Sequence, residues 1–127
     1  MSLKGKTNCR LTDSKGLGYL ALGGTKATDA GLAYFKDCKD LGRLLLNDTA
    51  VTDAGLANFK DCRNLTDLGL DRTKVTDAGL AYFKDCKGLT NLDVRKTQVT
   101  AKGLEAFHAA VPGCMIENEG GAIEPNK

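Results

Sequence analysis

Cysteine recurs at a fixed spacing in this chain, and a thiol could bind a metal, form a disulfide bond or react. Cys38, Cys62 and Cys86 stand 24 residues apart, while Cys9 and Cys114 lie outside that series. Zinc takes about four nitrogen or sulfur ligands in a tetrahedral array, and the chain has no Cys-x-x-Cys pair. The spacing therefore favours a column of buried, reduced thiols over a disulfide bond or a metal site.

The single histidine and one pair of acidic residues offer the other routes to chemistry. His108 follows Glu105 by three residues with no nucleophile nearby, which is typical of a surface histidine. The neighbouring Asp93 and Glu117 could bind calcium, but the loops with fixed ligand spacing that calcium sites use are absent. No phosphate-binding loop and no Ser/His/Asp set is present. The sequence therefore predicts no catalytic residue, no cofactor and no metal.

The cysteines recur because the chain is built from repeats. Four near-copies of 24 residues begin at Leu17, Leu41, Leu65 and Leu89. Their shared frame is L-x-x-L-x-L-x-x-T-x-V-T-D-A-G-L-A-x-F-K-D-C. A period of roughly 20–29 residues headed by L-x-x-L-x-L is the pattern of a leucine-rich repeat. The sequence predicts an α/β solenoid, with a parallel β-sheet on its concave face and short helices on its convex face.

The first half of each repeat has the pattern of a short strand and a turn. In the third repeat, Leu68 and Leu70 alternate with outward Gly69, as expected of a half-buried strand. Thr73 follows where the chain leaves the strand, and its hydroxyl could satisfy backbone groups of the turn. Threonine occupies the same place in the other repeats, as Thr25, Thr49 and Thr97.

The second half of each repeat has the pattern of a short helix. Thr76 is a suitable N-cap, and Asp77 lies in the first turn, where the helix dipole favours an anion. Leu80, Phe83 and Cys86 follow at three-residue spacing, so they share one face of the helix. That face is predicted to pack under the sheet, because so short a helix needs its neighbours for stability.

The two ends depart from the repeat frame. The chain divides into a degenerate N-terminal cap or truncated repeat at 1–16, four repeats at 17–112, and a C-terminal capping strand and tail at 113–127. Ile116 is predicted to lie in register with Leu92, and the tail after it is polar. If residues 1–16 are the remnant of a cut repeat, residues 1–22 would leave an open sheet edge that could mediate self-association.

The span 17–118 resembles bacterial leucine-rich repeat domains, specifically the planctomycete-type array with L-T-x-L-x-L-x-x-T-x-V-T-D-A-G-L repeats. The ending Pro112-Gly113-Cys114-Met115-Ile116-Glu117 is also similar to the way such arrays end. The helix-end cysteines resemble those of a cysteine-containing subclass. The resemblance implies a protein-interaction module without catalytic residues. Near-identical repeats are equally typical of recent duplication and of a consensus design.

Binding is expected on the concave face, where outward side chains vary while the frame stays fixed. In register they form columns, including one of Tyr19, Arg43, Asp67 and Asn91. Tyrosine and arginine are enriched in binding hot spots, and several carboxylates toward the C-terminus could attract a basic peptide. The predicted partner-binding residues are Tyr19, Arg43, Leu45, Asn47, Asp67, Asp71, Asn91, Asp93, Arg95 and Glu117.

Charge and hydropathy argue against some classes of binding partner. The 18 basic and 16 acidic residues leave a net charge of +2, too balanced for a typical nucleic-acid binder. No apolar run approaches the ~18 residues of a membrane span. The N-terminus lacks the apolar stretch of a secretory signal, and an odd number of cysteines favours an intracellular location. The predicted function is a non-catalytic module that binds a protein or peptide; the alternative is a structural spacer or scaffold without a specific ligand.

Overall fold

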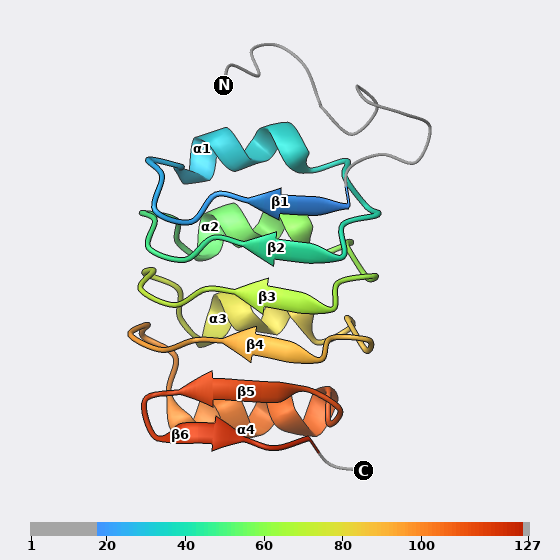
Figure 1. Ribbon diagram of the computed structural model, residues 1–127, viewed down its shortest axis with the longest axis vertical. Coiled ribbons are helices and arrows are strands. Elements are labelled where there is room, and N and C mark those ends of the chain that lie inside the picture. Colours follow the sequence, from blue (N-terminus) through green and yellow to red (C-terminus); the bar gives the residue numbers. More distant parts are fainter. Residues whose placement is uncertain (1–17, 126–127) are drawn as a thin grey trace.

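Strands and helices alternate along residues 18–125, the part of the chain that the computed structural model describes (Figure 1). The predicted cap at 1–16 lies outside the described residues. The strands are β1 (Tyr19–Ala21), β2 (Arg43–Leu45), β3 (Asp67–Gly69), β4 (Asn91–Asp93), β5 (Met115–Asn118) and β6 (Gly121–Ile123). The α-helices are α1 (Asp29–Leu32), α2 (Asp53–Leu56), α3 (Asp77–Leu80) and α4 (Ala101–Ala110). One turn of 3-10 helix follows each of the first three, as η1 (Ala33–Phe35), η2 (Ala57–Phe59) and η3 (Ala81–Phe83).

The six strands form one sheet in chain order, and β1 to β5 are parallel. The predicted register is confirmed, since Leu68 pairs with Leu92 and Leu92 pairs with Ile116. The tail contains more than the predicted polar terminator. Its strand β6 turns back and pairs antiparallel with β5, placing Ile123 beside Ile116. The β5–β6 hairpin therefore ends the parallel stack.

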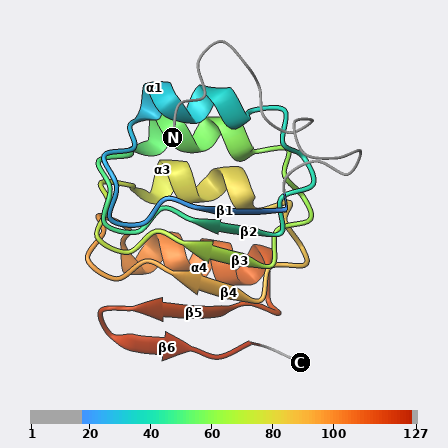
Figure 2. The ribbon, with the colours of Figure 1, turned by 45° about the horizontal axis from the view of Figure 1, so that its top comes forward.

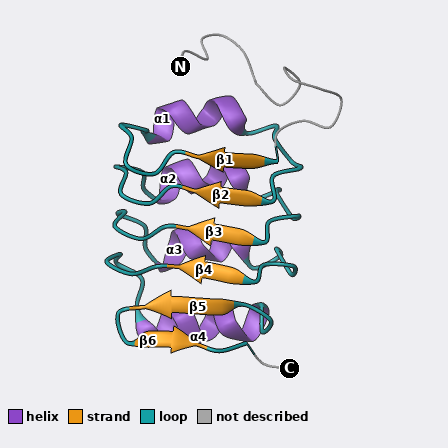
Figure 3. Ribbon diagram, in the orientation of Figure 1, coloured by secondary structure: helices purple, strands orange, loops and turns teal. Residues whose placement is uncertain are grey.

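The helices all lie on one side of the sheet (Figures 2 and 3). The inward leucines of each strand are buried, as are Phe59, Phe83 and Phe107 from successive repeats. This layer is one continuous cluster of leucine, phenylalanine, valine and cysteine. Because each repeat is thin, burial of its apolar residues depends on the repeats above and below it.

Each helix begins at the threonine predicted to cap it. The Thr76 hydroxyl accepts the backbone N–H of Ala78 at 3.2 Å. The predicted single helix is in fact split, because α3 ends at Leu80 and continues as the 3-10 turn η3. Cys86 therefore follows the helix, although it is still buried. A 3-10 turn is common at helix ends, where it tightens the last hydrogen bonds.

The turn after each strand is built on the repeated threonine. Thr25, Thr49, Thr73 and Thr97 each donate a hydroxyl hydrogen bond to the carbonyl three residues earlier, at 2.6–2.7 Å. This confirms the predicted role of these hydroxyls. The residue before each threonine has a left-handed backbone, with φ of 72°, 55°, 58° and 57° at Gly24, Asp48, Arg72 and Lys96. The sequence analysis did not predict this, because only the first of the four is glycine.

An aspartate in each internal helix holds the next repeat. The Asp53 carboxylate accepts the backbone N–H of Thr76 at 2.8 Å and its hydroxyl at 2.5 Å. Asp29 binds Thr52 and Asp77 binds Thr100 in the same way. We call these three pairs the aspartate–threonine ladder. The sequence analysis assigned such an aspartate only to the helix dipole.

Cys62, Cys86 and Cys114 are buried free thiols. This was predicted for Cys62 and Cys86. The Cys62 thiol donates to the Cys38 carbonyl at 3.1 Å, and the Cys86 thiol donates to the Cys62 carbonyl at 3.3 Å. Burial raises the pKa of both thiols to about 11 and that of Cys114 to about 12. For Cys38 the prediction of a reduced thiol is wrong, because Cys38 is disulfide-bonded.

Candidate functional site

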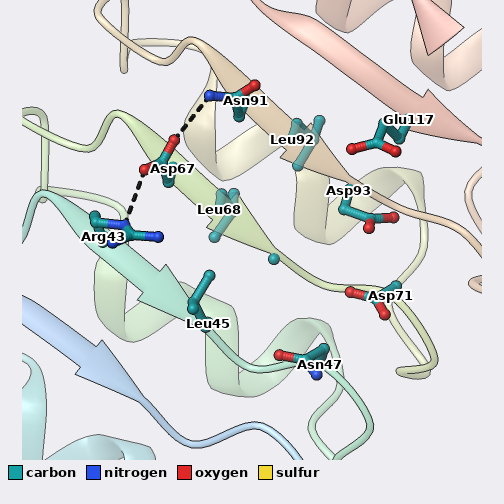
Figure 4. Close-up of a pocket in the computed structure, with 11 residues that line it drawn as sticks. Arg43, Leu45, Asn47, Asp67, Leu68, Asp71, Asn91, Leu92, Asp93 and Glu117 are labelled. Atoms are coloured by element: carbon teal, nitrogen blue, oxygen red, sulfur yellow. Dashed lines mark hydrogen bonds and ion pairs between the residues drawn. The ribbon is translucent and has the colours of Figure 1, made fainter.

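The outward side chains of β1 to β5, with those of the residues that follow these strands, form one surface, here called the sheet face. Eight of the ten predicted partner-binding residues line a single shallow cavity of about 340 Å³ on this face (Figure 4). They are Arg43, Leu45, Asn47, Asp67, Asp71, Asn91, Asp93 and Glu117. Leu68, Gly69 and Leu92 complete the lining. The register of the strands brings these residues together from three repeats and the capping strand β5.

The first column of the sheet face is connected by interactions across four strands. The Arg43 guanidinium lies over the Tyr19 ring, with Cζ 4.9 Å from the ring centroid. Its Nε lies 2.9 Å from Oδ2 of Asp67, and Oδ1 of Asp67 accepts the amide of Asn91 at 3.0 Å. Arg43 was predicted as a hot-spot residue; the structure also gives it two neighbours within the chain. These contacts connect the four side chains of the column to one another.

The second column has a gap in its middle. Leu45 on β2 is half-buried, and the next position along the column is Gly69, which has no side chain. A Cβ at Gly69 would stand 3.1 Å from Cδ2 of Leu45, so the leucine already leans over the glycine. Gly69 is buried beneath Leu45, so Leu45 fills the gap and its side chain is the apolar surface of this column. The sequence analysis did not include Gly69 among the binding residues, although an absent side chain in a variable column is a visible signal.

Three carboxylates gather on the side of the cavity away from Arg43, those of Asp71, Asp93 and Glu117 (Figure 4). Asp93 forms a two-pronged ion pair with Arg95, at 3.0 Å to Nε and 2.6 Å to a terminal nitrogen. Burial raises the pKa of the Asp71 carboxyl above its usual value, and the charge of Asp93 adds to the rise. The positive charges of Arg95 and Arg72 partly offset that rise, and both side chains line the hollow beside this side of the cavity.

Two predicted residues lie outside the cavity. Tyr19 is 51% exposed at the first strand and reaches the site only through Arg43. Arg95 lines a smaller hollow of about 120 Å³ with Asp71 and Glu119. Glu119 there accepts the backbone N–H of Lys96 at 2.5 Å. The structure thus places all ten predicted residues on one face and gathers eight of them at one site.

The structure does not bring the candidate catalytic or metal-binding side chains of the described residues together. His108 on α4 is half-buried, not fully exposed as predicted, and its Nδ1 is buried without a hydrogen-bond partner among the described residues. Within residues 18–125, no group of three or more histidine, cysteine or acidic side chains could hold a metal ion. None of the helices in that range is long and apolar enough to cross a membrane.

Comparison with solved structures identifies the architecture. The chain is similar to the crystal structure of an internalin from Listeria monocytogenes, with a TM-score of 0.61 and 21% sequence identity. The fold is a leucine-rich repeat solenoid. The match covers 77% of this leucine-rich repeat chain but only 26% of the internalin, so it shows the fold alone. No protein-family model and no curated protein matches the sequence.

Proposed function

We propose that this leucine-rich repeat solenoid is a non-catalytic module that binds a protein or peptide on its sheet face. The observation that carries the proposal is the cavity to which three repeats and the capping strand contribute variable side chains. The inward positions of the same strands keep leucine or isoleucine, since they fill the core. Variation confined to one face is what a binding surface on a fixed scaffold requires.

The chemistry of the face supports a macromolecular partner. An aromatic ring, an arginine and a half-buried leucine occur side by side in Tyr19, Arg43 and Leu45, and residues of these kinds contribute strongly to protein interfaces. The cavity is shallow, which suits a side chain of a partner protein better than an enclosed small molecule. The connected first column is held in place beforehand, which lowers the entropy lost on binding.

The test is affinity capture from a lysate of the source organism with the chain as bait, read by mass spectrometry. The variant carries Leu45→Asp and Asn47→Lys, which change the cavity without breaking the Arg43–Asp67 pair. The matched control carries Lys36→Glu and Lys60→Glu, which lie on the exposed helix side. We expect a protein that native chain and control retain and the cavity variant loses, with equal melting temperatures. Identical lists from all three baits would favour the alternative.

That alternative is a spacer or scaffold array with no specific ligand. It is favoured by one observation, that both arginines of the sheet face already have acidic partners within the chain, at Asp67 and Asp93. In such an array the face needs only to be solvated. Substitutions at Leu45 would then change no interaction, and any self-association would depend on the N-terminal edge at residues 1–22.

We also infer that the array is of the bacterial planctomycete type, on the strength of its repeat frame, and that it binds neither nucleic acid nor a membrane. An intracellular location is supported by the free thiols of Cys62, Cys86 and Cys114. The disulfide bond at Cys38 argues against that location. Cell fractionation with an antibody against the chain decides between the compartments.

A further inference from the structure

The cavity on the sheet face is negatively charged, although the whole chain is not. One arginine and four carboxylates line it, a net charge of −3, while the chain carries +2 overall. The helix side is balanced, because Lys36, Lys60 and Lys84 alternate with acidic neighbours in the same repeats. The negative potential is thus local to the face that we propose as the binding surface. Complementary charge is a common basis of partner choice.

Arg43 lines the cavity, and Arg72, Arg95 and Lys96 line the hollow beside it with Asp71. Arg43 is engaged by Asp67 and Arg95 by Asp93. Among the described residues, Asp71 and Glu117 form no ion pair, and they flank Asp93 in the cavity (Figure 4). Carboxylates brought together in this way repel one another, so a partner that supplies a positive charge relieves that repulsion.

The apolar side chain of Leu45 lines the same cavity as these carboxylates. Gly69 precedes Asp71 by two residues on the same outward side, and Leu45 leans over it from the neighbouring strand. A lysine or arginine has an aliphatic stem that packs on apolar surface while its charged head stays among polar groups. Leu45 and the carboxylates therefore match the two parts of one long basic side chain.

We propose that the partner is a protein segment rich in lysine or arginine. The stem of one such side chain packs on Leu45, and its charged head lies among Asp71, Asp93 and Glu117. This inference rests on the proposed function and specifies the chemistry of the partner. It also separates this site from the Tyr19–Arg43–Asp67–Asn91 column, whose charges are matched within the chain.

The probe is a library of random 12-residue peptides displayed on phage and selected on the full 127-residue chain. Selected peptides are then synthesised, and their affinities are measured by fluorescence anisotropy. The test variant is Asp71→Asn with Glu117→Gln, which removes two charges and keeps the side-chain shapes. The matched control is Asp37→Asn with Asp61→Asn, which removes two exposed charges from the helix side. A third variant, Leu45→Ser, removes the apolar wall without adding charge.

We expect the selected peptides to be rich in lysine or arginine and to bind the test variant at least about tenfold more weakly than the native chain. The control should bind as the native chain does, and replacing the peptide's basic residues with glutamine should cause a similar loss. Binding should also weaken as salt rises, since solvent-exposed charges are screened.

Other outcomes separate the two proposals. Peptides that depend on Leu45 but bind the test variant normally would overturn the inference about charge and leave the sheet face as the binding surface. Basic peptides that weaken equally on test variant and control would show general charge attraction and overturn the specific site. Peptides indifferent to all three variants, or no selected peptide at all, would count against both proposals.

Discussion

The carboxylate of Asp53 binds Thr76 of the following repeat twice, through the backbone N–H at 2.8 Å and the hydroxyl at 2.5 Å. The same hydroxyl accepts the N–H of Ala78 in the first turn of the next helix. One helix therefore sets the position at which its neighbour begins. The arrangement recurs at every boundary between described repeats, so the aspartate–threonine ladder ties the helices together as the sheet ties the strands.

Removing one member of the ladder should weaken the array. Asp53→Ala leaves the N–H and hydroxyl of Thr76 without their acceptor, and a hydrogen bond to a charged group contributes about 1.5–3 kcal/mol. We expect a loss of about 2–3 kcal/mol in the free energy of unfolding, measured by urea denaturation. The exposed Asp61→Ala should cost less than about 0.5 kcal/mol. Equal losses at the two sites would show that the ladder does not stabilise the fold.

Gly79 should not accept a side chain. A Cβ at this position would meet the Asp53 carboxylate and stand 3.1 Å from Cδ1 of Leu56. Gly79→Ala must therefore push the ladder apart, and we expect a cost of about 1–3 kcal/mol in thermal or urea unfolding. Gly88→Ala is the control, because a Cβ there meets nothing within 4 Å. Combined with Asp53→Ala, the Gly79 change should cost less than the sum of the two, as coupled neighbours do.

Glycine should be tolerated at the left-handed position of each turn without loss of stability. Arg72 has φ of 58°, a conformation that costs L-residues roughly 1–2 kcal/mol relative to the right-handed one and that glycine adopts freely. Arg72→Gly should leave the urea midpoint unchanged or raise it. The control is Lys74→Gly, two residues later, where the backbone φ is not positive. Glycine relieves no strain there and only increases the conformational freedom of the unfolded chain, so it should lower the urea midpoint. A lower midpoint for both would argue against relief of strain.

The buried thiols predict a loss of stability in alkali. The pKa of Cys62 and Cys86 is raised from 9.0 to about 11, so the folded chain keeps these protons at pH values where the unfolded chain loses them. The stability that these protonated thiols contribute to the fold is fully present below about pH 9 and is lost as the pH rises through about 11. The urea midpoint of the native chain should therefore fall more steeply across this range than that of a Cys62→Ala, Cys86→Ala variant. Parallel pH curves would contradict buried, protonated thiols.

The Asp71 carboxylate in the cavity of the sheet face should weaken the fold at neutral pH. The pKa of Asp71 is raised by burial, so any stability that this group contributes is present below its usual pKa and is lost as pH rises. Asp71→Asn should therefore be slightly more stable than the native chain at pH 7, by about 0.5 kcal/mol or less because water screens the site. The difference should vanish near pH 3. A variant that is less stable at pH 7 would show that Asp71 has a structural role.

The repeat pattern predicted the strands, the register and the capping threonines, because each follows from spacing within 24 residues. Leu68, for example, could face only the core once Leu70 did the same. The ladder was missed because hydrogen bonds between repeats do not appear in the periodicity of one repeat. A signal existed: Asp and Gly occur two residues apart in all three internal helices, and the fourth has Ala101 in place of the aspartate.

The face of the site could be predicted, but its internal chemistry could not. The strand period placed Arg43 and Asp67 in one column, yet their ion pair depends on side-chain conformations that spacing does not determine. The disulfide bond at Cys38 was missed because the repeat treats all helix-end cysteines alike. Strand β6 was missed because its three residues, Gly121–Ile123, carry no alternating pattern long enough to indicate a strand.

The ladder gives the array a direction. An internal repeat offers a carboxylate to its successor and a threonine to its predecessor, so any internal repeat can follow any other. The last helix begins with Ala101 and offers no carboxylate, and the β5–β6 hairpin occupies the end of the sheet. Length is therefore adjustable in steps of one module: an additional copy of an internal repeat can be inserted ahead of the last one, which adds one strand to the sheet face and leaves the β5–β6 hairpin unchanged.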